Sequence, residues 1–149
     1  MFNLAIDSKL RSCDLVKLKV KDVQRGTALL SRASVVQKKT HQTVQFEITE
    51  HTRAALQDWI SQAGLRYDDY LFKSRLRGSG HLSTRQYARI VESWVAEIGL
   101  DPAAYGTHSL RRTKASLIYK KTKNIRVVQL LLGHKKLEST VRYLGIDVD

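Results

Sequence analysis

The stretch that decides the fold covers residues 107–143 and reads THSLRRTKASLIYKKTKNIRVVQLLLGHKKLESTVRY. Within it, His108 and Arg111 are three residues apart, so on a helix they share one face with about 5–6 Å between their Cβ atoms. Gly133 is typical of the left-handed residue that ends a helix; a histidine follows it directly, and Tyr143 closes the stretch. Arginines, two imidazoles and a phenol at these spacings indicate chemistry on a phosphodiester.

The chain is strongly basic. Its 149 residues include 26 Lys and Arg against 14 Asp and Glu, which gives a formal net charge of +12. From His108 to the end there are ten basic residues and three acidic ones, so this part holds more than half of the excess. A charge of this size usually indicates an anionic partner, and nucleic acid is the commonest. A basic solvated surface is the alternative that charge alone leaves open.

Composition also limits the class of protein. An apolar fraction of 42% is typical of a globular domain, and the length suits one domain with its own core. The single cysteine, Cys13, cannot form an internal disulfide, which favours a reducing compartment. No stretch approaches the roughly 20 apolar residues of a membrane span, and no signal peptide is visible. We therefore expect a cytoplasmic protein with no contact to a membrane.

Several common kinds of catalytic site are not supported. The five histidines show no HExxH spacing, and no set of carboxylates converges with them, so we expect no metal. The phosphate-binding patterns GxxxxGK[ST] and GxGxxG and the hydrolase pattern GxSxG are all missing, so we expect no nucleotide cofactor. The remaining option is a metal-free, cofactor-free site built from arginine, lysine, histidine and tyrosine.

The pattern along the chain predicts a mainly α-helical α+β fold. Alternating or aliphatic segments at 17–23, 28–37 and 42–48 predict one small three-stranded antiparallel sheet, with a polar hairpin tip at 38–41. Apolar residues at helical spacing predict helices over residues 2–6, 49–62, 83–99, 107–121, 125–132 and 136–142. Thr107 is a suitable N-cap for its helix, whereas the helix at 2–6 begins without a capping residue.

Some charged residues have two interpretations each. Arg11, taken alone, is most simply an exposed arginine paired with Asp14 at i, i+3. The loop KSRLRGSG, residues 73–80, suits a phosphate contact or is a plain mobile loop. Arg112 is either a phosphate contact or a salt-bridge partner. As candidate DNA-binding residues we take Lys38, Lys73, Arg75, Arg77 and Arg112.

Such side chains suit phosphoryl transfer. Arginine forks stabilise negative charge on the non-bridging oxygens, and a lysine or imidazole can give the leaving oxygen a proton. A tyrosine can attack phosphorus if neighbouring cations offset its pKa of about 10. The covalent intermediate would then keep the energy of the phosphodiester and allow rejoining without ATP.

These residues also carry a resemblance to a known family. His108-Ser109-Leu110-Arg111, then Leu132-Gly133-His134, then Tyr143 resembles the HxxR…LGH…Y pattern of the tyrosine recombinases, the phage integrase family. The segment 10–15 (LRSCDL) is similar to the family segment with the first catalytic arginine, and Lys38-Lys39-Thr40 resembles its β-hairpin lysine. The family often has Thr-Gly where this chain has Ser8-Lys9. The resemblance spans residues 2–144, nearly the whole chain.

The resemblance implies a role for each matched residue. Tyr143 would be the nucleophile that forms a 3′-phosphotyrosyl link, and Arg11 and Arg111 would clamp the scissile phosphate. Lys39 would protonate the leaving 5′-oxygen, with Lys38 as the alternative, because a hairpin register can slip by one residue. The catalytic set is completed by His108 in acid–base transfer and His134 at the phosphate.

It also implies a fold like the recombinase catalytic domain and site-specific recombination or integration of mobile DNA. The alternatives are a type IB topoisomerase-like enzyme that nicks and reseals, and a non-catalytic DNA-binding regulator. We expect residues 1–149 to form one catalytic domain of a longer protein, without the N-terminal DNA-binding domain. Its partner would be double-stranded DNA, and the protein would be of bacterial or phage origin and associated with the nucleoid. The full-length protein would self-associate on its DNA. Alone, the chain should be monomeric, bind DNA weakly and recombine little.

Overall fold

The computed structural model describes residues 1–76 and 80–144, and it is mainly helical. In chain order the helices are α1 (Phe2–Ser8), α2 (Ser12–Leu15), α3 (Val20–Val23), α4 (Glu50–Ala63), α5 (Thr84–Glu97), α6 (Thr107–Thr122), α7 (Ile125–Leu132) and α8 (Leu137–Leu144). The strands are β1 (Gln24–Arg25), β2 (Ala28–Leu29), β3 (Arg32–Val36) and β4 (Thr43–Glu47). No described helix is long and apolar enough to cross a membrane. The mainly helical α+β fold class is thus confirmed.

The longer helices begin and end where local chemistry predicts. The Ser83 hydroxyl accepts from the Gln86 N–H at 3.0 Å, and Asn124 caps α7 in the same way. Gly133 ends α7 with φ at 71°, in the left-handed region that favours glycine. One expected cap is wrong by a residue: α6 has Gly106 at its N-cap position, and Thr107 is already its first helical residue.

The sheet differs from the expected one. Two separate two-stranded hairpins are present, β1 with β2 and β3 with β4, in place of a single three-stranded sheet. The segment 17–23 is not a strand, because residues 20–23 form the short helix α3. The Asp22 carboxylate accepts from the Lys19 N–H at 2.8 Å and so caps that turn, while Val20 and Val23 are both buried one helical turn apart.

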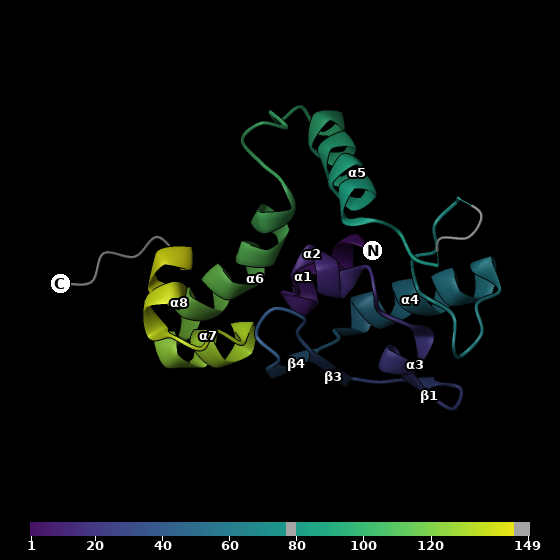
Figure 1. Cartoon of the computed structure of the whole chain (residues 1–149), viewed down its shortest axis with the longest axis horizontal. Helices are drawn as coiled ribbons and strands as arrows, with labels where there is room; N and C mark the ends of the chain where they lie inside the picture. Colours follow the sequence, from purple (N-terminus) through teal and green to yellow (C-terminus); the bar gives the residue numbers. More distant parts are fainter. Residues whose placement is uncertain (77–79, 145–149) are drawn as a thin grey trace.

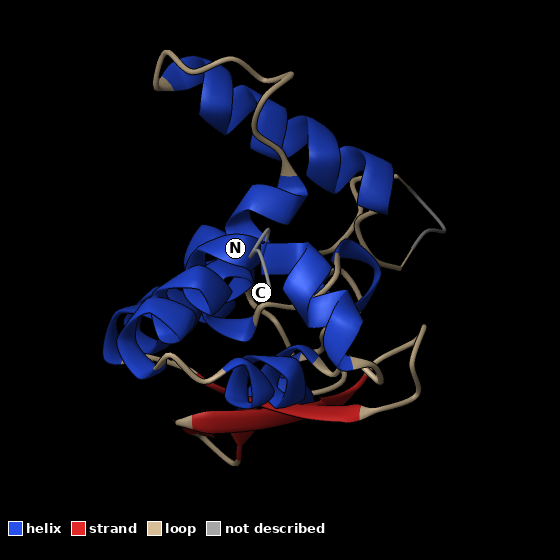
Figure 2. Ribbon diagram, turned by 90° about the vertical axis from the view of Figure 1, so that its left-hand side faces the viewer, coloured by secondary structure: helices blue, strands red, loops and turns tan. Residues whose placement is uncertain are grey.

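The hydrophobic core has two parts. The larger part involves α1 to α5 and the strands, whereas Ala115, Val128 and Leu132 form a smaller cluster among α6, α7 and α8. In Figure 1 the last three helices lie at the left of the molecule, beside α1 and the β3–β4 hairpin. Figure 2 shows the strands at the lower edge, with the helices above them.

Two buried hydrogen bonds connect these parts of the core. Arg111 Nε on α6 donates to the Lys9 carbonyl at 2.7 Å. Gln37 Nε2, at the end of β3, donates to the Leu132 carbonyl at 3.0 Å. Because both bonds span long sequence separations, they fix the C-terminal helices against the first half of the chain.

Candidate active site

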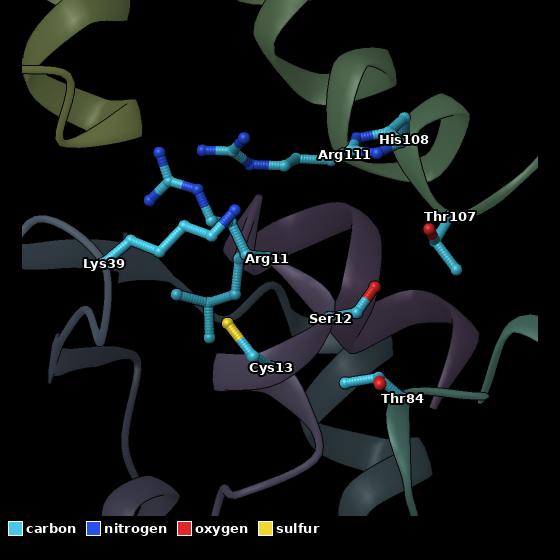
Figure 3. Close-up of a pocket in the computed structure, with 9 residues that line it drawn as sticks. Arg11, Ser12, Cys13, Lys39, Thr84, Thr107, His108 and Arg111 are labelled. Atoms are coloured by element: carbon cyan, nitrogen blue, oxygen red, sulfur yellow. The ribbon is translucent and has the colours of Figure 1, made fainter. Parts of the chain in front are cut away.

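The first predicted arginine lies at a sharp turn between α1 and α2. Lys9 ends α1 in the left-handed conformation, with φ at 57° and ψ at 20°. This conformation favours glycine. Lys9 stands at the position where the resembled pattern has the glycine of Thr-Gly, which would adopt this conformation without strain. Arg11 then occupies the N-cap position of α2, with extended backbone. The Arg11 guanidinium lies near that of Arg111 on α6 (Figure 3).

A hollow of about 280 Å³ opens beside this turn, and four of the six predicted catalytic residues line it. They are Arg11, Lys39, His108 and Arg111, and they come from three separate parts of the chain. Figure 3 shows the Arg11 and Arg111 guanidinium groups and the Lys39 ammonium at one end of this hollow, with Thr84 and Thr107 at the other. Several cations around one space of this size form a site for an anionic group.

A second hollow, also about 280 Å³, shares Arg11 and Lys39 with the first. His134, Lys135 and Lys136 line its other side. Arg11 and Lys39 therefore lie between two openings, and the second opening joins the turn after α7 to the same cationic centre. Five of the six predicted residues border this combined space.

Arg111 is the most deeply buried of these cations, with 5% of its surface exposed. Its Nε donates to the Lys9 carbonyl, and its Nη2 donates to the Leu132 carbonyl at 3.4 Å. The guanidinium carbon also lies 4.9 Å from the centre of the Tyr143 ring. Burial lowers the pKa of Arg111 from its usual range, although an arginine keeps its charge in any case. The guanidinium is therefore charged, fixed and next to the predicted nucleophile.

The Tyr143 ring packs against the Arg111 guanidinium, and Tyr143 lines neither hollow. Its hydroxyl is buried without a hydrogen bond of ordinary geometry among the described residues, although the Arg111 side chain is near enough to act on it as a donor and lower its pKa. The Arg11 Nη1 atom is also buried and has no partner among these residues. Burial raises the pKa of the Tyr143 phenol, whereas the positive charges of Arg111, Arg112 and Arg11 act to lower it. These arginines are placed to stabilise a phenolate.

His134 is held in one orientation directly after Gly133. Its Nδ1 lies 2.9 Å from the hydroxyl of the fully buried Thr140, and its ring meets that of Tyr143 edge-on at 5.6 Å. Burial, with smaller contributions from Arg111 and Arg11, lowers the pKa of His134 to about 4. The imidazole is therefore neutral near pH 7 and can donate a hydrogen bond without adding charge.

The remaining two catalytic candidates are on the surface. His108 is exposed on the first turn of α6 and borders the first hollow. Of the two hairpin lysines, Lys39 lines both hollows, whereas Lys38 lines neither of them. The backbone N–H of Lys38 donates to the Asp14 carboxylate at 3.0 Å. This geometry favours Lys39 as the lysine nearer a bound phosphate.

Apart from Lys38 on the hairpin turn, the candidate DNA contacts fall in two places. Arg112 is exposed beside the site and acts on Tyr143 through its charge. Lys73 and Arg75 are exposed on the loop before α5, and Lys73 forms an ion pair with Asp69 at 3.3 Å. In Figure 1 this loop lies at the right of the molecule, away from α7 and α8. Arg77 lies outside the described residues.

The sequence interpretation missed several buried polar residues, among them Asp14, Gln37 and Gln129. Asp14 is not a surface ion-pair partner of Arg11, because it is buried and accepts from the Lys38 N–H. Gln37 and Gln129 are also buried and bind the Leu132 and His134 carbonyls respectively. The signal for Gln129 was available, since it is the one polar side chain in the apolar run 127–132. Within the described ranges, no three His, Cys, Asp or Glu side chains gather closely enough to hold a metal ion.

A sequence model described as the Phage integrase family matches residues 1–148 of the chain. The chain belongs to the phage integrase family. It is 35% identical to the probable integrase/recombinase YoeC of Bacillus subtilis, and the match covers 100% of this chain and 77% of that protein. A tyrosine recombinase of Pseudothermotoga lettingae is 32% identical over 98% of this chain and 48% of its own length.

The fold also matches solved structures of this kind. The crystal structure of the XerH site-specific recombinase bound to its difH substrate, in a pre-cleavage complex, superposes with a TM-score of 0.76 at 23% identity. The match covers 98% of this chain and 42% of that one. This phage integrase family chain thus spans three quarters of one relative and about half of the other two.

Proposed function

We propose that this chain is the catalytic domain of a site-specific recombinase that cuts and rejoins double-stranded DNA through Tyr143, without a metal or cofactor. The observation that carries the proposal is the shared hollow of Arg11, Lys39 and Arg111, with the Tyr143 ring 4.9 Å from the Arg111 guanidinium. The relatives come from bacteria, so the substrate would be bacterial or phage DNA in the nucleoid.

In this proposal the scissile phosphate enters the first hollow. Arg11 and Arg111, which both line this hollow, bind its non-bridging oxygens. His134, neutral and fixed by Thr140, adds a hydrogen bond from the second hollow. These donors stabilise the charge that develops on phosphorus oxygens in the transition state.

The proposed reaction forms one bond at phosphorus and breaks another. The Tyr143 oxygen attacks phosphorus, a P–O bond to the phenol forms, and the bond from phosphorus to the 5′-oxygen breaks. His108 takes the phenol proton, and the Lys39 ammonium gives a proton to the departing 5′-oxygen. The products are a 3′-phosphotyrosyl link and a 5′-hydroxyl. Because the Tyr143 hydroxyl is buried, we expect α8 to shift toward the hollow before attack.

The proposal extends to what lies around the site. Lys38 and Arg112 would contact phosphates next to the scissile one, and Lys73, Arg75 and Arg77 more distant ones. Recombination exchanges strands between two duplexes, so the full-length protein would self-associate on its DNA.

A covalent trap tests this function. A pool of nicked suicide duplexes with a randomised centre would be incubated at low salt, so that a short 5′-hydroxyl strand diffuses away after cleavage. We expect a protein–DNA adduct that survives detergent and disappears in Tyr143→Phe. Adduct with plasmid relaxation but no strand exchange would favour a topoisomerase-like enzyme. Salt-sensitive binding without any adduct would favour a non-catalytic regulator.

A further inference from the structure

Gln37 is a buried polar residue that the proposed chemistry does not use. Only 1% of its surface is exposed, at the point where β3 ends and the hairpin turn with Lys39 begins. A glutamine is rarely this buried, because its amide must be stripped of water. Both ends of the Gln37 amide are hydrogen-bonded, which offsets that cost.

One end of the amide fixes the turn itself. Gln37 Oε1 accepts from the Thr40 hydroxyl at 2.8 Å, so the side chain closes over the segment that contains Lys38 and Lys39. The Gln37 backbone adds two bonds: its N–H donates to the Gln42 carbonyl at 2.9 Å, and its carbonyl accepts from the His41 N–H at 3.0 Å. Gln37 thus holds the turn from which the Lys39 side chain projects.

The other end reaches the opposite part of the site. Gln37 Nε2 donates to the Leu132 carbonyl at 3.0 Å, and the same carbonyl accepts from Arg111 Nη2 at 3.4 Å. Leu132 is the last residue of α7, whose terminal carbonyls have no partner within the helix. One oxygen therefore joins the lysine hairpin to the buried arginine.

Packing brings the same elements together. A Cβ atom built on Gly133 would meet Gln37 Oε1 first, and would lie 2.7 Å from Val44 Cγ1 and 3.0 Å from Gln37 Cδ. The hairpin and the end of α7 thus approach as closely as a glycine permits. His134 follows at the next position, so the contact also sets the imidazole relative to the hairpin.

We infer that Gln37 is a positioning residue, which holds the Lys39 hairpin in register with Arg111 through the Leu132 carbonyl. Its effect on the reaction rests on the proposed function. With the amide in place, the Lys39 ammonium lies beside the leaving oxygen of a phosphate held by Arg111. Without the amide, the phosphate is still clamped, but the proton donor lies on a loosened turn.

The substitution Gln37→Met tests this, because methionine keeps the length and volume but cannot replace either hydrogen bond. Gln45→Met is the matched control, since Gln45 is exposed on β4 of the same hairpin. Both variants would be made in the 149-residue chain, and circular dichroism would show whether each is folded.

The first readout compares two leaving groups in the suicide duplex pool. A sulfur in place of the bridging 5′-oxygen leaves as a thiolate. The thiol has a pKa near 8.5, so this leaving group needs no proton from lysine, whereas an alcohol has a far higher pKa and its alkoxide does need one. For Gln37→Met we expect adduct formation to slow by about 10-fold or more with oxygen and by less than about 3-fold with sulfur. Lys39→Ala should show the same pattern more strongly, and Gln45→Met should show neither loss. Equal losses on both substrates, or no loss, would overturn the inference.

The second readout needs no catalysis. Hydrogen exchange at the His41 amide, which donates to the Gln37 carbonyl, should become at least about 10-fold faster in Gln37→Met, while amides of α4 keep their rates. Unchanged exchange at residues 38–42 would show that Gln37 does not hold the turn, and would overturn the inference even if no duplex gave an adduct. Absence of an adduct in the unaltered chain would instead count against the proposed function.

Discussion

Arg111 and Lys9 are two buried cations at the base of the site, and the backbone of Lys9 holds the side chain of Arg111. Arg111 Nε donates to the Lys9 carbonyl at 2.7 Å, and the Lys9 ammonium donates to the Asp7 carbonyl at 2.8 Å. Burial and the nearby Lys114 lower the pKa of Lys9 to about 8, although Asp7 and Glu47 oppose this. The site thus uses the Lys9 carbonyl, while the charge of Lys9 costs stability.

Lys9→Met should reveal that cost through pH. Between pH 8 and pH 10.5 the folded chain has released the Lys9 proton, whereas an unfolded lysine still holds it. The unfolded state then binds more protons, so the contribution of Lys9 to the free energy of unfolding rises with pH across this window. Urea unfolding at several pH values should show a smaller rise in Lys9→Met, which lacks the titrating group. An identical rise in both proteins would contradict this environment for Lys9.

His134→Gln should change stability on the acid side. The pKa of His134 is lowered from 6.5 to about 4, so between these values the unfolded chain is protonated there and the folded chain is not. The His134 contribution is fully present above pH 6.5 and is lost as the pH falls toward 4. The difference in urea midpoint between pH 7 and pH 4.5 should therefore be smaller in His134→Gln. A larger difference in the variant would show that the imidazole is charged in the folded state.

At the scale of the element, local signals were enough for most helices and not for the segment 17–23. The helices α5 and α7 have apolar stripes and side-chain caps in Ser83 and Asn124, which are visible in the sequence. Residues 17–23 alternate as a strand does, but a single hydrogen bond from the Lys19 N–H to Asp22 and contacts with residues 67–71 decide the structure there. The competing signal was the acidic residue three positions after Lys19, which suits a helical turn.

Gly133→Ala should destabilise the chain more than Gly64→Ala, although both glycines end a helix at positive φ. Each alanine pays the left-handed cost of about 1–2 kcal/mol. At Gly64 the new methyl group meets nothing within 4 Å, whereas at Gly133 it would lie 2.7 Å from Val44 Cγ1. Overpacking there should add about 1–3 kcal/mol. Urea unfolding of both variants measures the difference, and equal losses would show that the hairpin does not approach Gly133 so closely.

At the scale of the molecule, the site depends on contacts between residues that are about 100 positions apart. The helical spacing of His108 and Arg111 could be predicted, because it is local. The placement of Arg11 and Lys39 beside them came only from the resemblance, since periodicity does not tell which helix packs against which. Neither periodicity nor the resemblance predicted that Gln37 is buried. In the sequence it is a polar residue at the end of a strand, and only the packing of α7 onto the hairpin buries it.

The net charge of +12 predicts that DNA binding depends on salt. The local environment of each lysine predicts how much that lysine contributes to the salt dependence. Lys136 is exposed at the second hollow, so a phosphate contact there would release counterions and add about 0.9 to the slope of log K against log salt. Lys73 already pairs with Asp69 at 3.3 Å, so a contact there should add less. Fluorescence anisotropy from 50 to 200 mM salt should therefore show a shallower slope for Lys136→Ala than for Lys73→Ala. The reverse order would mean that the loop before α5 carries the main DNA contact, and that the duplex crosses the right-hand side of Figure 1 rather than the hollows.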